Sequence, residues 1–440
     1  MRGVVIAGTG SGAGKTSIAT GLMRKLSRTM NVQGFKVGPD FIDPMFHKAA
    51  TGRHSRNLDS FMMTKDVVKN LAAYGSKDAD ISIVEGVRGL FEGQSGTDES
   101  GSTAEIAKLL GLPVVLVVNA RSLTRSAAAI VNGFRSYDKE LNIVGVILNN
   151  ISGAQHEGKL KEAMRDSNIR VLGAVRRGAD LMIHERHLGL DTEELSDKSV
   201  INGMESMAEG VDIDQLMDVC GGQNGDKACF PYVERNSGLT AAIPMDDAFC
   251  FYYRENIECM MASGIKVKHF SPLKGDPLPD ADIYYLGGGY PELHMEQLSE
   301  NRDLFQGLKT ACDDGKVIIG ECGGMLMMCT SIKTGGSSYK TAGIFNAEAD
   351  MIGRRHGPVY VIARANSRCR LFEGTVRGHE FHYTTVHLGP GCEFGFDVLR
   401  GSDMNRGRDG MVQRNAFGTY MHQHALSAED WMGRIAGMCK

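Results

Sequence analysis

A glycine-rich stretch near the start of the chain, residues 8–16 (GTGSGAGKT), constrains the fold more than any other feature. It follows an apolar run at 4–7 and precedes apolar residues at helical spacing (Ile18, Leu22 and Leu26), so we predict a strand, a phosphate-binding loop and a helix. The backbone N–H groups of such a loop and the positive helix end bind phosphate oxygens, while a lysine adds a point charge. We therefore expect nucleotide contacts from Thr9, Gly10, Ser11, Gly12, Ala13, Gly14, Lys15 and Thr16.

Carboxylates follow two of the next predicted strands. The strand at 32–37 leads to Asp40 and Asp43, and a later apolar strand ends in Glu85. Loops at the carboxyl ends of parallel strands bind ligands, and an acid beside a phosphate loop holds the magnesium ion that bridges nucleotide phosphates. We expect Mg²⁺ at Thr16, Asp40 and Glu85, with Asp43 either sharing that ion or orienting a substrate. A surface turn that binds nothing is the alternative for the two aspartates.

The remaining strands of the first half indicate the fold class. The runs at 114–118, 143–148 and 171–175 are continuously apolar, which is typical of strands buried on both faces. Asn149 follows the second run, where its side-chain amide is expected to read the edge of a nucleotide base. The alternating β/α series predicts an α/β protein with a doubly wound parallel sheet.

The composition changes between the two halves of the chain. Residues 191–237 are polar and acidic, with one amphipathic stretch followed by a glycine-rich segment, and no buried strand is predicted there. We expect a helix and a linker, with a domain boundary near residue 237. This division gives an ATP-binding domain at 1–190, the connecting segment at 191–237, and a second α/β domain at 238–440.

A cysteine in the second half stands where a nucleophile is expected. The strand at 317–319 enters residues 320–324 (GECGG), in which glycines flank Cys322, and a helix follows. This is the layout of a nucleophile elbow, in which the small neighbours permit a strained turn and the helix N-terminus lowers the thiol pKa. An earlier turn at 287–292 (GGGYPE) also follows a strand, and its N–H groups are candidates for an oxyanion hole. A buried structural cysteine is the alternative.

A thiolate nucleophile needs a histidine as its base. His422 and His424 lie near the end of the chain and project to the same side of a predicted extended segment, and we take His422 as the base. The stretch 378–383 (GHEFHY) is a third histidine cluster with the composition of a metal site. No cysteine or carboxylate cage is near it in the sequence, so we do not assign a metal there.

The composition favours small-molecule chemistry. The 440 residues suffice for about two or three domains, and 49 basic against 53 acidic residues leave a net charge of −4 with no long block of one sign. Neither nucleic acid nor a membrane surface is indicated as a partner. Ten cysteines form no CxxC pair. The chain shows no signal peptide and no apolar run of membrane-spanning length, so we expect a cytoplasmic protein.

Seven of these motifs together resemble the cobyrinate a,c-diamide synthase family, and they stand in the order in which that family carries them. The phosphate loop, with Thr9 in place of its usual first glycine, resembles the dethiobiotin synthetase branch. The motifs are residues 37–44 (VGPDFIDP), 85–93 (EGVRGLFEG), 101–104 (GSTA), 287–292 (GGGYPE), 320–324 (GECGG), 378–382 (GHEFH) and 418–422 (GTYMH). The resemblance is weakest between residues 191 and 237.

The resemblance implies a dethiobiotin-synthetase-like ATPase domain followed by a class I glutamine amidotransferase domain. Cys322 would be the glutaminase nucleophile, His422 its base, and Gly288 part of the oxyanion hole. Class I amidotransferases usually carry a glutamate two residues after that histidine; His424 stands there and is the candidate for the third triad member. The implied ligands are ATP, Mg²⁺, L-glutamine and a metal tetrapyrrole.

The implied reaction is amidation of the a and c acetate carboxylates of cobyrinate, through an acyl phosphate and ammonia released at Cys322. A very similar enzyme amidates nickel sirohydrochlorin, cobyric acid synthase performs four amidations with the same domain pair, and a nucleotide-switched positioning ATPase is the alternative from another class. Arg88 and Glu92 depart from the methionine and aspartate that we expect in the family motif; Arg88 is a candidate contact for substrate carboxylates, and a neutral sequence change is the alternative. The oligomeric state, a homodimer included, is left open.

Overall fold

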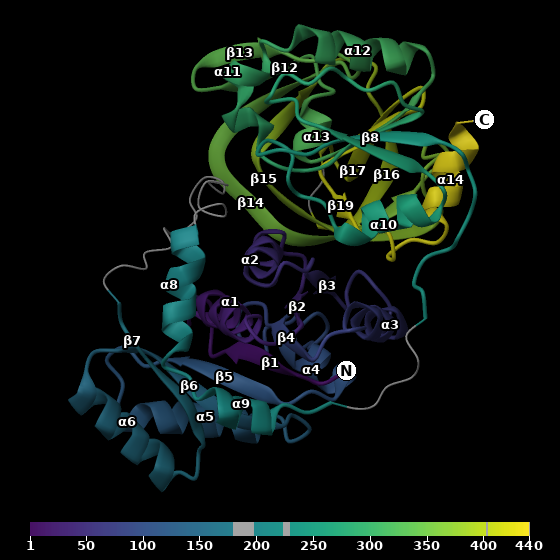
Figure 1. Ribbon diagram of the computed structural model, residues 1–440. Coiled ribbons are helices and arrows are strands. Elements are labelled where there is room, and N and C mark those ends of the chain that lie inside the picture. The colour runs from purple at the N-terminus through teal and green to yellow at the C-terminus, as the bar shows by residue number, and fades with distance from the viewer. Residues whose placement is uncertain (179–197, 223–228, 402–403, 440) are drawn as a thin grey trace. The chain divides into compact units, whose positions relative to one another are not determined.

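The structure, a computed structural model, describes residues 1–178, 198–222, 229–401 and 404–439 (Figure 1). The chain divides into two compact units, Met1–Pro231 and Tyr232–Lys440. Two helices, α8 (Lys198–Ala208) and α9 (Ile213–Val219), contribute buried residues to the core of the first unit. They therefore belong to that unit, where the sequence suggested a separate connecting segment. Other parts of that segment, residues 191–197 and 223–228, lie outside the described residues.

The first unit is built on a seven-stranded, wholly parallel sheet in the order β3-β2-β4-β1-β5-β6-β7. Its strands are almost continuously apolar and buried, as expected for a sheet covered on both faces. This confirms the predicted doubly wound parallel sheet. The strands are β1 (Gly3–Gly8), β2 (Val32–Val37), β3 (Arg56–Leu58), β4 (Ile81–Glu85), β5 (Val114–Asn119), β6 (Ile143–Ile151) and β7 (Val171–Arg176).

Helices cover both faces of this sheet because right-handed crossovers on either side of β1 run in opposite directions. The helices α1, α2 and α8 pack on one face, where Ile18, Phe46 and Met204 join a single apolar cluster with Val4 and Ile6 of β1. The other helices between the strands cross on the opposite face. The bounds are α1 (Lys15–Leu26), α2 (Ile42–Thr51), α3 (Lys65–Gly75), α4 (Thr103–Leu110), α5 (Arg125–Tyr137) and α6 (Ala154–Asp166).

The second unit contains a twelve-stranded mixed sheet. Its parallel part runs β9-β8-β10-β11-β18, and antiparallel strands extend it from β18 through β17 and β16 to β14. The strands are β8 (Thr240–Pro244), β9 (Lys266–Phe270), β10 (Ile283–Leu286), β11 (Val317–Glu321), β12 (Ser331–Thr334), β13 (Ser337–Lys340), β14 (Ala347–Ala365), β15 (Thr375–Leu388), β16 (Glu393–Arg400), β17 (Arg408–Gln413), β18 (Ala416–Thr419) and β19 (His422–Gln423).

Alternation along the central strands produces two apolar layers in the second unit. Ile318 of β11 packs with α12 on one face, whereas Val317 and Ile319 pack with α10 and α14 on the other. The helical elements are α10 (Arg254–Ala262), η1 (Pro291–Leu293), α11 (Met295–Leu298), α12 (Arg302–Asp313), α13 (Gly323–Leu326) and α14 (Trp431–Met438). Among the described residues, no helix is both long and apolar enough to cross a lipid bilayer.

Three neighbouring parallel strands bring chemistry-bearing motifs to one edge of the second sheet. In β10, β11 and β18 the pairing register aligns Leu286 with Gly320, and Gly320 with Gly418. The residues that follow all three strands, including Cys322 and His422, therefore emerge at the same edge. Carboxyl ends of parallel strands are the usual place for a ligand site in such sheets.

Candidate active sites in the two units

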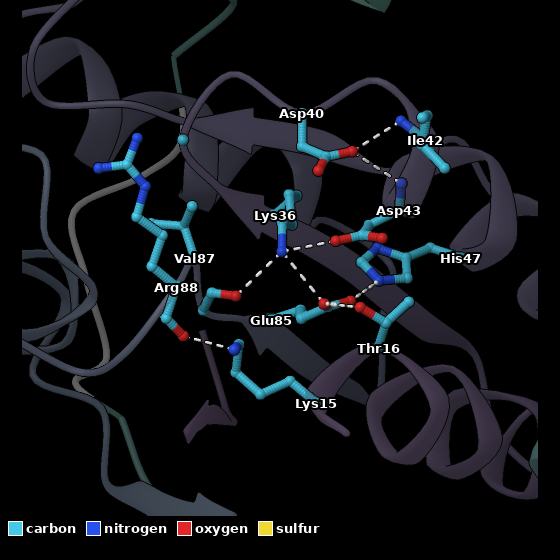
Figure 2. Close-up of polar contacts among 12 residues, drawn as sticks. Lys15, Thr16, Lys36, Asp40, Ile42, Asp43, His47, Glu85, Val87 and Arg88 are labelled. Carbon is cyan, nitrogen blue, oxygen red and sulfur yellow. Dashed lines mark hydrogen bonds and ion pairs between the residues drawn. The ribbon is translucent and has the colours of Figure 1, made fainter. Parts of the chain in front are cut away.

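The loop after β1 holds its lysine against backbone oxygens. The helix α1 begins at Lys15, whose Nζ donates to the carbonyl oxygen of Gly10 (3.3 Å). The same nitrogen donates to the carbonyl oxygen of Arg88 (Figure 2). Gly14 has a φ of 95°, and a Cβ there would overlap the side chain of Asn149. Burial lowers the pKa of Lys15, and the positive charge of Lys36 lowers it further.

Glu85 lies at the centre of a buried polar network. Thr16 Oγ1 donates to its Oε1 (2.7 Å), Lys36 Nζ contacts the same oxygen at 3.1 Å, and His47 Nε2 lies 2.8 Å from Oε2 (Figure 2). The glutamate, the lysine and the histidine are all at most 3% exposed. Thr16 and Glu85 thus meet as the sequence pattern suggests, and they present a hydroxyl and a carboxylate oxygen side by side.

A second carboxylate holds the other side of Lys36. Asp43 Oδ2 lies 2.7 Å from Lys36 Nζ, and the Gly86 carbonyl accepts from the same nitrogen at 2.9 Å. Burial lowers the pKa of Lys36, but the carboxylates of Asp43 and Glu85 outweigh that effect and raise the pKa above its ordinary value. The lysine is therefore a permanent buried cation between the two strands that carry the site.

The structure gives local roles to several of the predicted ligand-binding residues. Asp40 Oδ1 accepts from the backbone N–H groups of Ile42 and Asp43, so this oxygen caps the start of α2, whereas the sequence suggested a metal ligand. Asp43 is buried and paired with Lys36, so its carboxylate is not presented to a substrate in this conformation. Arg88 extends an exposed side chain beside the loop.

Asn149 is bonded to the phosphate loop. Its Nδ2 donates to the carbonyl oxygen of Ala13 (2.9 Å), and its Oδ1 accepts from the N–H of Asn150 (2.8 Å). The bond to Ala13 fastens the phosphate loop to the end of β6, while the bond from Asn150 is local to that strand. The residue also lines the adjoining cavity, and its amide keeps a second N–H and a second lone pair beyond these two bonds.

A cavity of about 950 Å³ opens beside the loop within the first unit. It extends from the start of α1 to the end of β7 and the side of α8, and this volume is ample for a nucleotide. Its lining residues are Gly12, Gly14, Lys15, Thr16, Ser17, Asn149, Asn150, Glu157, Lys161, Ala174, Val175, Arg176, Arg177, Gly178, Ser206, Met207, Glu209 and Gly210.

In the second unit, Cys322 occupies a strained turn between β11 and α13. Its backbone has φ 49° and ψ −112°, a conformation that residues other than glycine rarely adopt. Neighbouring glycines make the turn possible, because a Cβ at Gly324 would overlap the Leu286 carbonyl and one at Gly323 would lie 2.6 Å from Pro291. The strained turn and the glycines agree with the predicted nucleophile elbow.

The expectation of a lowered thiol pKa is wrong. Burial raises the pKa of Cys322 well above its ordinary value, the nearby carboxyl of Glu292 raises it further, and the N–H of Gly323 opposes them only weakly. The helix α13 has four residues, too few for a strong dipole at its N-terminus. Cys322 is consequently a neutral thiol in this structure, and its Sγ lies 3.5 Å from the carbonyl oxygen of Phe381.

His422 lies in the same buried region, stacked on His379 with ring centroids 4.9 Å apart. Burial lowers the pKa of His422 to about 3, so the ring is neutral and can accept a proton. Its Nδ1 lies 3.9 Å from Oε2 of Glu321, the residue immediately before Cys322. Burial in turn raises the pKa of Glu321 to about 8.

His424 faces a different carboxylate. Its Nε2 lies 3.4 Å from Oε2 of Glu255 on α10, and its Nδ1 accepts from the backbone N–H of Leu426 (3.2 Å). The ring also packs against Tyr253, with centroids 4.8 Å apart. The carboxyl group beside His422 thus comes from Glu321, while His424, at the position of the usual triad glutamate, contacts Glu255.

The backbone of Gly288 lies directly against the ring of His422. A Cβ at Gly288 would overlap Cε1 of the His422 ring, so a side chain is excluded there. The N–H of Gly288 donates to the carbonyl oxygen of Phe251 (3.2 Å), and the Gly288 carbonyl accepts from the Phe251 N–H (3.0 Å). The predicted oxyanion role would therefore require this N–H to leave its present acceptor.

Sequence reasoning missed several members of the two sites. His47 sits inside α2, outside the motifs that the sequence analysis singled out for their chemistry, and only the fold brings it to Glu85 and to Ser55 Oγ (2.9 Å from Nδ1). Glu321 could have been found from the sequence, because it directly precedes the nucleophile. In the structure, Tyr285 donates to its carboxylate from the paired strand β10.

Sequence comparisons agree with this two-site architecture. Residues 4–188 match the CobQ/CobB/MinD/ParA nucleotide binding domain, and residues 240–430 match the CobB/CobQ-like glutamine amidotransferase domain. The chain therefore belongs to the class of proteins that join a phosphate-loop nucleotide-binding domain to a glutamine amidotransferase domain.

Full-length relatives narrow this class to one family. Cobyrinate a,c-diamide synthase of Methanococcus vannielii is 42% identical over 445 residues, and the alignment covers 97% of each chain. The enzyme of the same name from Methanocaldococcus jannaschii is 41% identical over 437 residues, again with 97% of each chain covered. A solved glutamine amidotransferase from Thermotoga maritima is 14% identical with a TM-score of 0.32, covering 44% of this chain and 80% of that one. The chain belongs to the cobyrinate a,c-diamide synthase family.

Proposed function

We propose that this protein amidates the a and c acetate carboxylates of cobyrinate, using ATP and glutamine. The observation that carries the proposal is that one chain holds both halves of this chemistry. The first unit has a phosphate loop with Lys15, Thr16 and Glu85 beside a nucleotide-sized cavity. The second has Cys322 on a strained elbow in the same buried region as His422. The family membership supports the choice of macrocycle.

In the glutaminase half, the sulfur of Cys322 adds to the side-chain amide carbon of glutamine. Because burial keeps Cys322 as a neutral thiol, we propose that His422 takes its proton as the C–S bond forms. The same proton then passes to the leaving nitrogen, which departs as ammonia and leaves a thioester. Water hydrolyses the thioester to glutamate and restores the thiol. Glu321, at 3.9 Å from Nδ1 of His422, acts as the positioning residue for the ring.

In the ligase half, a carboxylate oxygen of the macrocycle attacks the γ-phosphorus of ATP, and ADP leaves. We propose that the loop N–H groups and Lys15 bind the transferred phosphate, with Lys15 exchanging its present carbonyl acceptors for phosphate oxygens. Oxygen donors at Thr16 and Glu85 fit a magnesium ion, which would neutralise phosphate charge when bound. His47 holds the other carboxylate oxygen of Glu85, and Lys36 contacts the oxygen that accepts from Thr16.

Ammonia from the glutaminase half then attacks the carbonyl carbon of the acyl phosphate and expels inorganic phosphate, giving the amide. Activation is required because a carboxylate does not react with ammonia directly, and exclusion of water protects the acyl phosphate. Two rounds of this sequence consume two ATP and two glutamine molecules and produce the diamide. We place the reaction in the cytoplasm, where ATP and glutamine are available.

The test is to incubate the purified protein with ATP, Mg²⁺ and glutamine, offering cobyrinate or nickel sirohydrochlorin, and to count amides by mass spectrometry. We expect two amidations of cobyrinate. Two amidations of nickel sirohydrochlorin with none of cobyrinate would replace the macrocycle in the proposal, and four amidations of a corrinoid would point to cobyric acid synthase. ATP hydrolysis with no amidation of any tetrapyrrole would refute the proposed substrate class.

A further inference from the structure

A group of three side chains in the second unit has the composition of a metal site. His356 of β14 and Glu380 and His382 of β15 each offer one ligand atom, and these atoms lie within 4.8 Å of one another. His356 pairs with His382 across the two strands, and Glu380, two residues before His382, points to the same face of β15. The sequence showed only the Glu-Phe-His part of this group, because His356 is distant in the chain.

One of the histidines is already prepared as a ligand. His382 Nδ1 lies 2.7 Å from the carbonyl oxygen of Thr384, and since a carbonyl only accepts, Nδ1 carries the proton and Nε2 keeps its lone pair. The ring stacks on Tyr420, with centroids 3.8 Å apart.

The spacing of the other two groups also suits an ion. His356 Nε2 lies 3.7 Å from Glu380 Oε2, longer than a hydrogen bond. Two ligand atoms of a tetrahedral zinc ion lie about 3.3 Å apart, given bonds of about 2.0–2.1 Å. Glu380 is only 2% exposed, while the side chain of His356 is 40% exposed. The histidine can thus move the remaining distance, and its exposed side gives an ion access.

We propose that His356, Glu380 and His382 bind a divalent transition-metal ion, with Zn²⁺ as the ion to which two imidazoles and one carboxylate are best suited. Such a set leaves a fourth position for water or another ligand. The site goes beyond the proposed amidation, which uses none of these three side chains.

The place of the site ties it to the glutaminase chemistry. Glu380 and His382 flank Phe381, whose carbonyl oxygen lies against Cys322 Sγ. An ion that joins β14 to β15 at these residues stiffens the strand that borders the nucleophile.

Zinc binding by the full-length chain tests the proposal. All variants carry Cys322→Ser, because a thiolate is itself a zinc ligand. After removal of metal with a chelator, retained Zn²⁺ is measured by equilibrium dialysis and mass spectrometry of the metal, and Co²⁺ spectra report the ligand geometry. His356→Gln and Glu380→Gln each remove one ligand, and His387→Gln is the matched control, an exposed histidine on the same strand β15.

We expect the Cys322→Ser protein and its His387→Gln control to bind one more zinc ion per chain than the two ligand variants, or to bind it at least about tenfold more tightly. Zn²⁺ should raise the melting temperature only of the Cys322→Ser protein and of its His387→Gln control. In the absence of metal, equal melting temperatures of all four proteins show that the ligand variants are folded. Equal zinc binding by all four proteins, or loss of binding in His387→Gln as well, overturns the site. Retention of no zinc by the Cys322→Ser protein also overturns it.

Discussion

Replacing Gly288 with alanine should separate the two nitrogen sources of the reaction. The added Cβ would overlap Cε1 of His422 and lie 3.2 Å from its Nδ1 and 3.3 Å from its Nε2, whereas ordinary contacts begin at 3.4 Å. The ring is 1% exposed and stacked on His379, so it has no space in which to rotate freely. A displacement of roughly 1 Å in a catalytic group costs on the order of 10²-fold in rate. We expect that loss, about 2.7 kcal/mol of transition-state stabilisation, in glutamine-supported amidation.

Ammonia-supported amidation should stay within about threefold of wild type, because that route does not need the glutaminase residues. The assay compares kcat with glutamine and with ammonium chloride, under saturating ATP and macrocycle. Gly437→Ala is the matched control: it lies in α14 of the same unit, a Cβ there meets nothing within 4 Å, and both activities should be kept. Unchanged glutamine-supported activity in Gly288→Ala would show that the placement of His422 does not limit the reaction.

Further variants test the separate sites. Lys15→Ala should abolish amidation with either nitrogen donor while glutamine hydrolysis at Cys322 persists, and amide formed from ammonia would contradict the phosphate-loop assignment. Asn149→Ala removes the bond to Ala13 and should raise the KM for ATP about fivefold, a value typical of one hydrogen bond, as steady-state kinetics will show. Because burial raises the pKa of Glu321 from 4.5 to about 8, its carboxyl stabilises the fold fully below pH 4.5, and that stability is lost as the pH rises through 8. The melting temperature of Glu321→Gln should therefore rise relative to that of wild type as the pH increases from 5 to 8. A constant difference between the two melting temperatures over this range would refute the burial argument.

Much of the first unit could be predicted from the sequence because its signals are local. Continuous apolar runs marked the buried parallel strands, and the phosphate loop with its lysine and hydroxyl occupies adjacent positions in the chain. The proximity of Thr16 to Glu85 also followed, since the loop that leads to Thr16 leaves the carboxyl end of β1, and Glu85 ends the neighbouring strand β4. What the sequence could not decide is which partner each polar atom prefers. Asp40 lies close enough to its own helix N-terminus to cap it.

In the second unit the elbow at Cys322 was predictable from its glycines, but the charge state of its groups was not. The pKa of a thiol at a helix N-terminus depends on how much water reaches it, and burial is decided by residues far away in the chain. The role of Glu292 shows this point. Its carboxyl is 4% exposed and burial raises its pKa to about 7, yet in the sequence it is an ordinary glutamate after a proline.

The carboxyl group beside the histidine base carries a further consequence of the topology. In a triad with the glutamate two residues after the histidine, base and orienting acid share one strand. Here Glu321 is the last residue of β11 and directly precedes Cys322, so the nucleophile and the group beside His422 Nδ1 are adjacent in the chain, and the histidine arrives from β19. Tyr285 donates to Glu321 from β10, so this contact holds the acid independently of the segment that carries the histidine. Because Glu321 supplies the carboxyl group beside His422, the position two residues after His422 does not need an acid. A histidine that contacts Glu255, His424, can therefore occupy it.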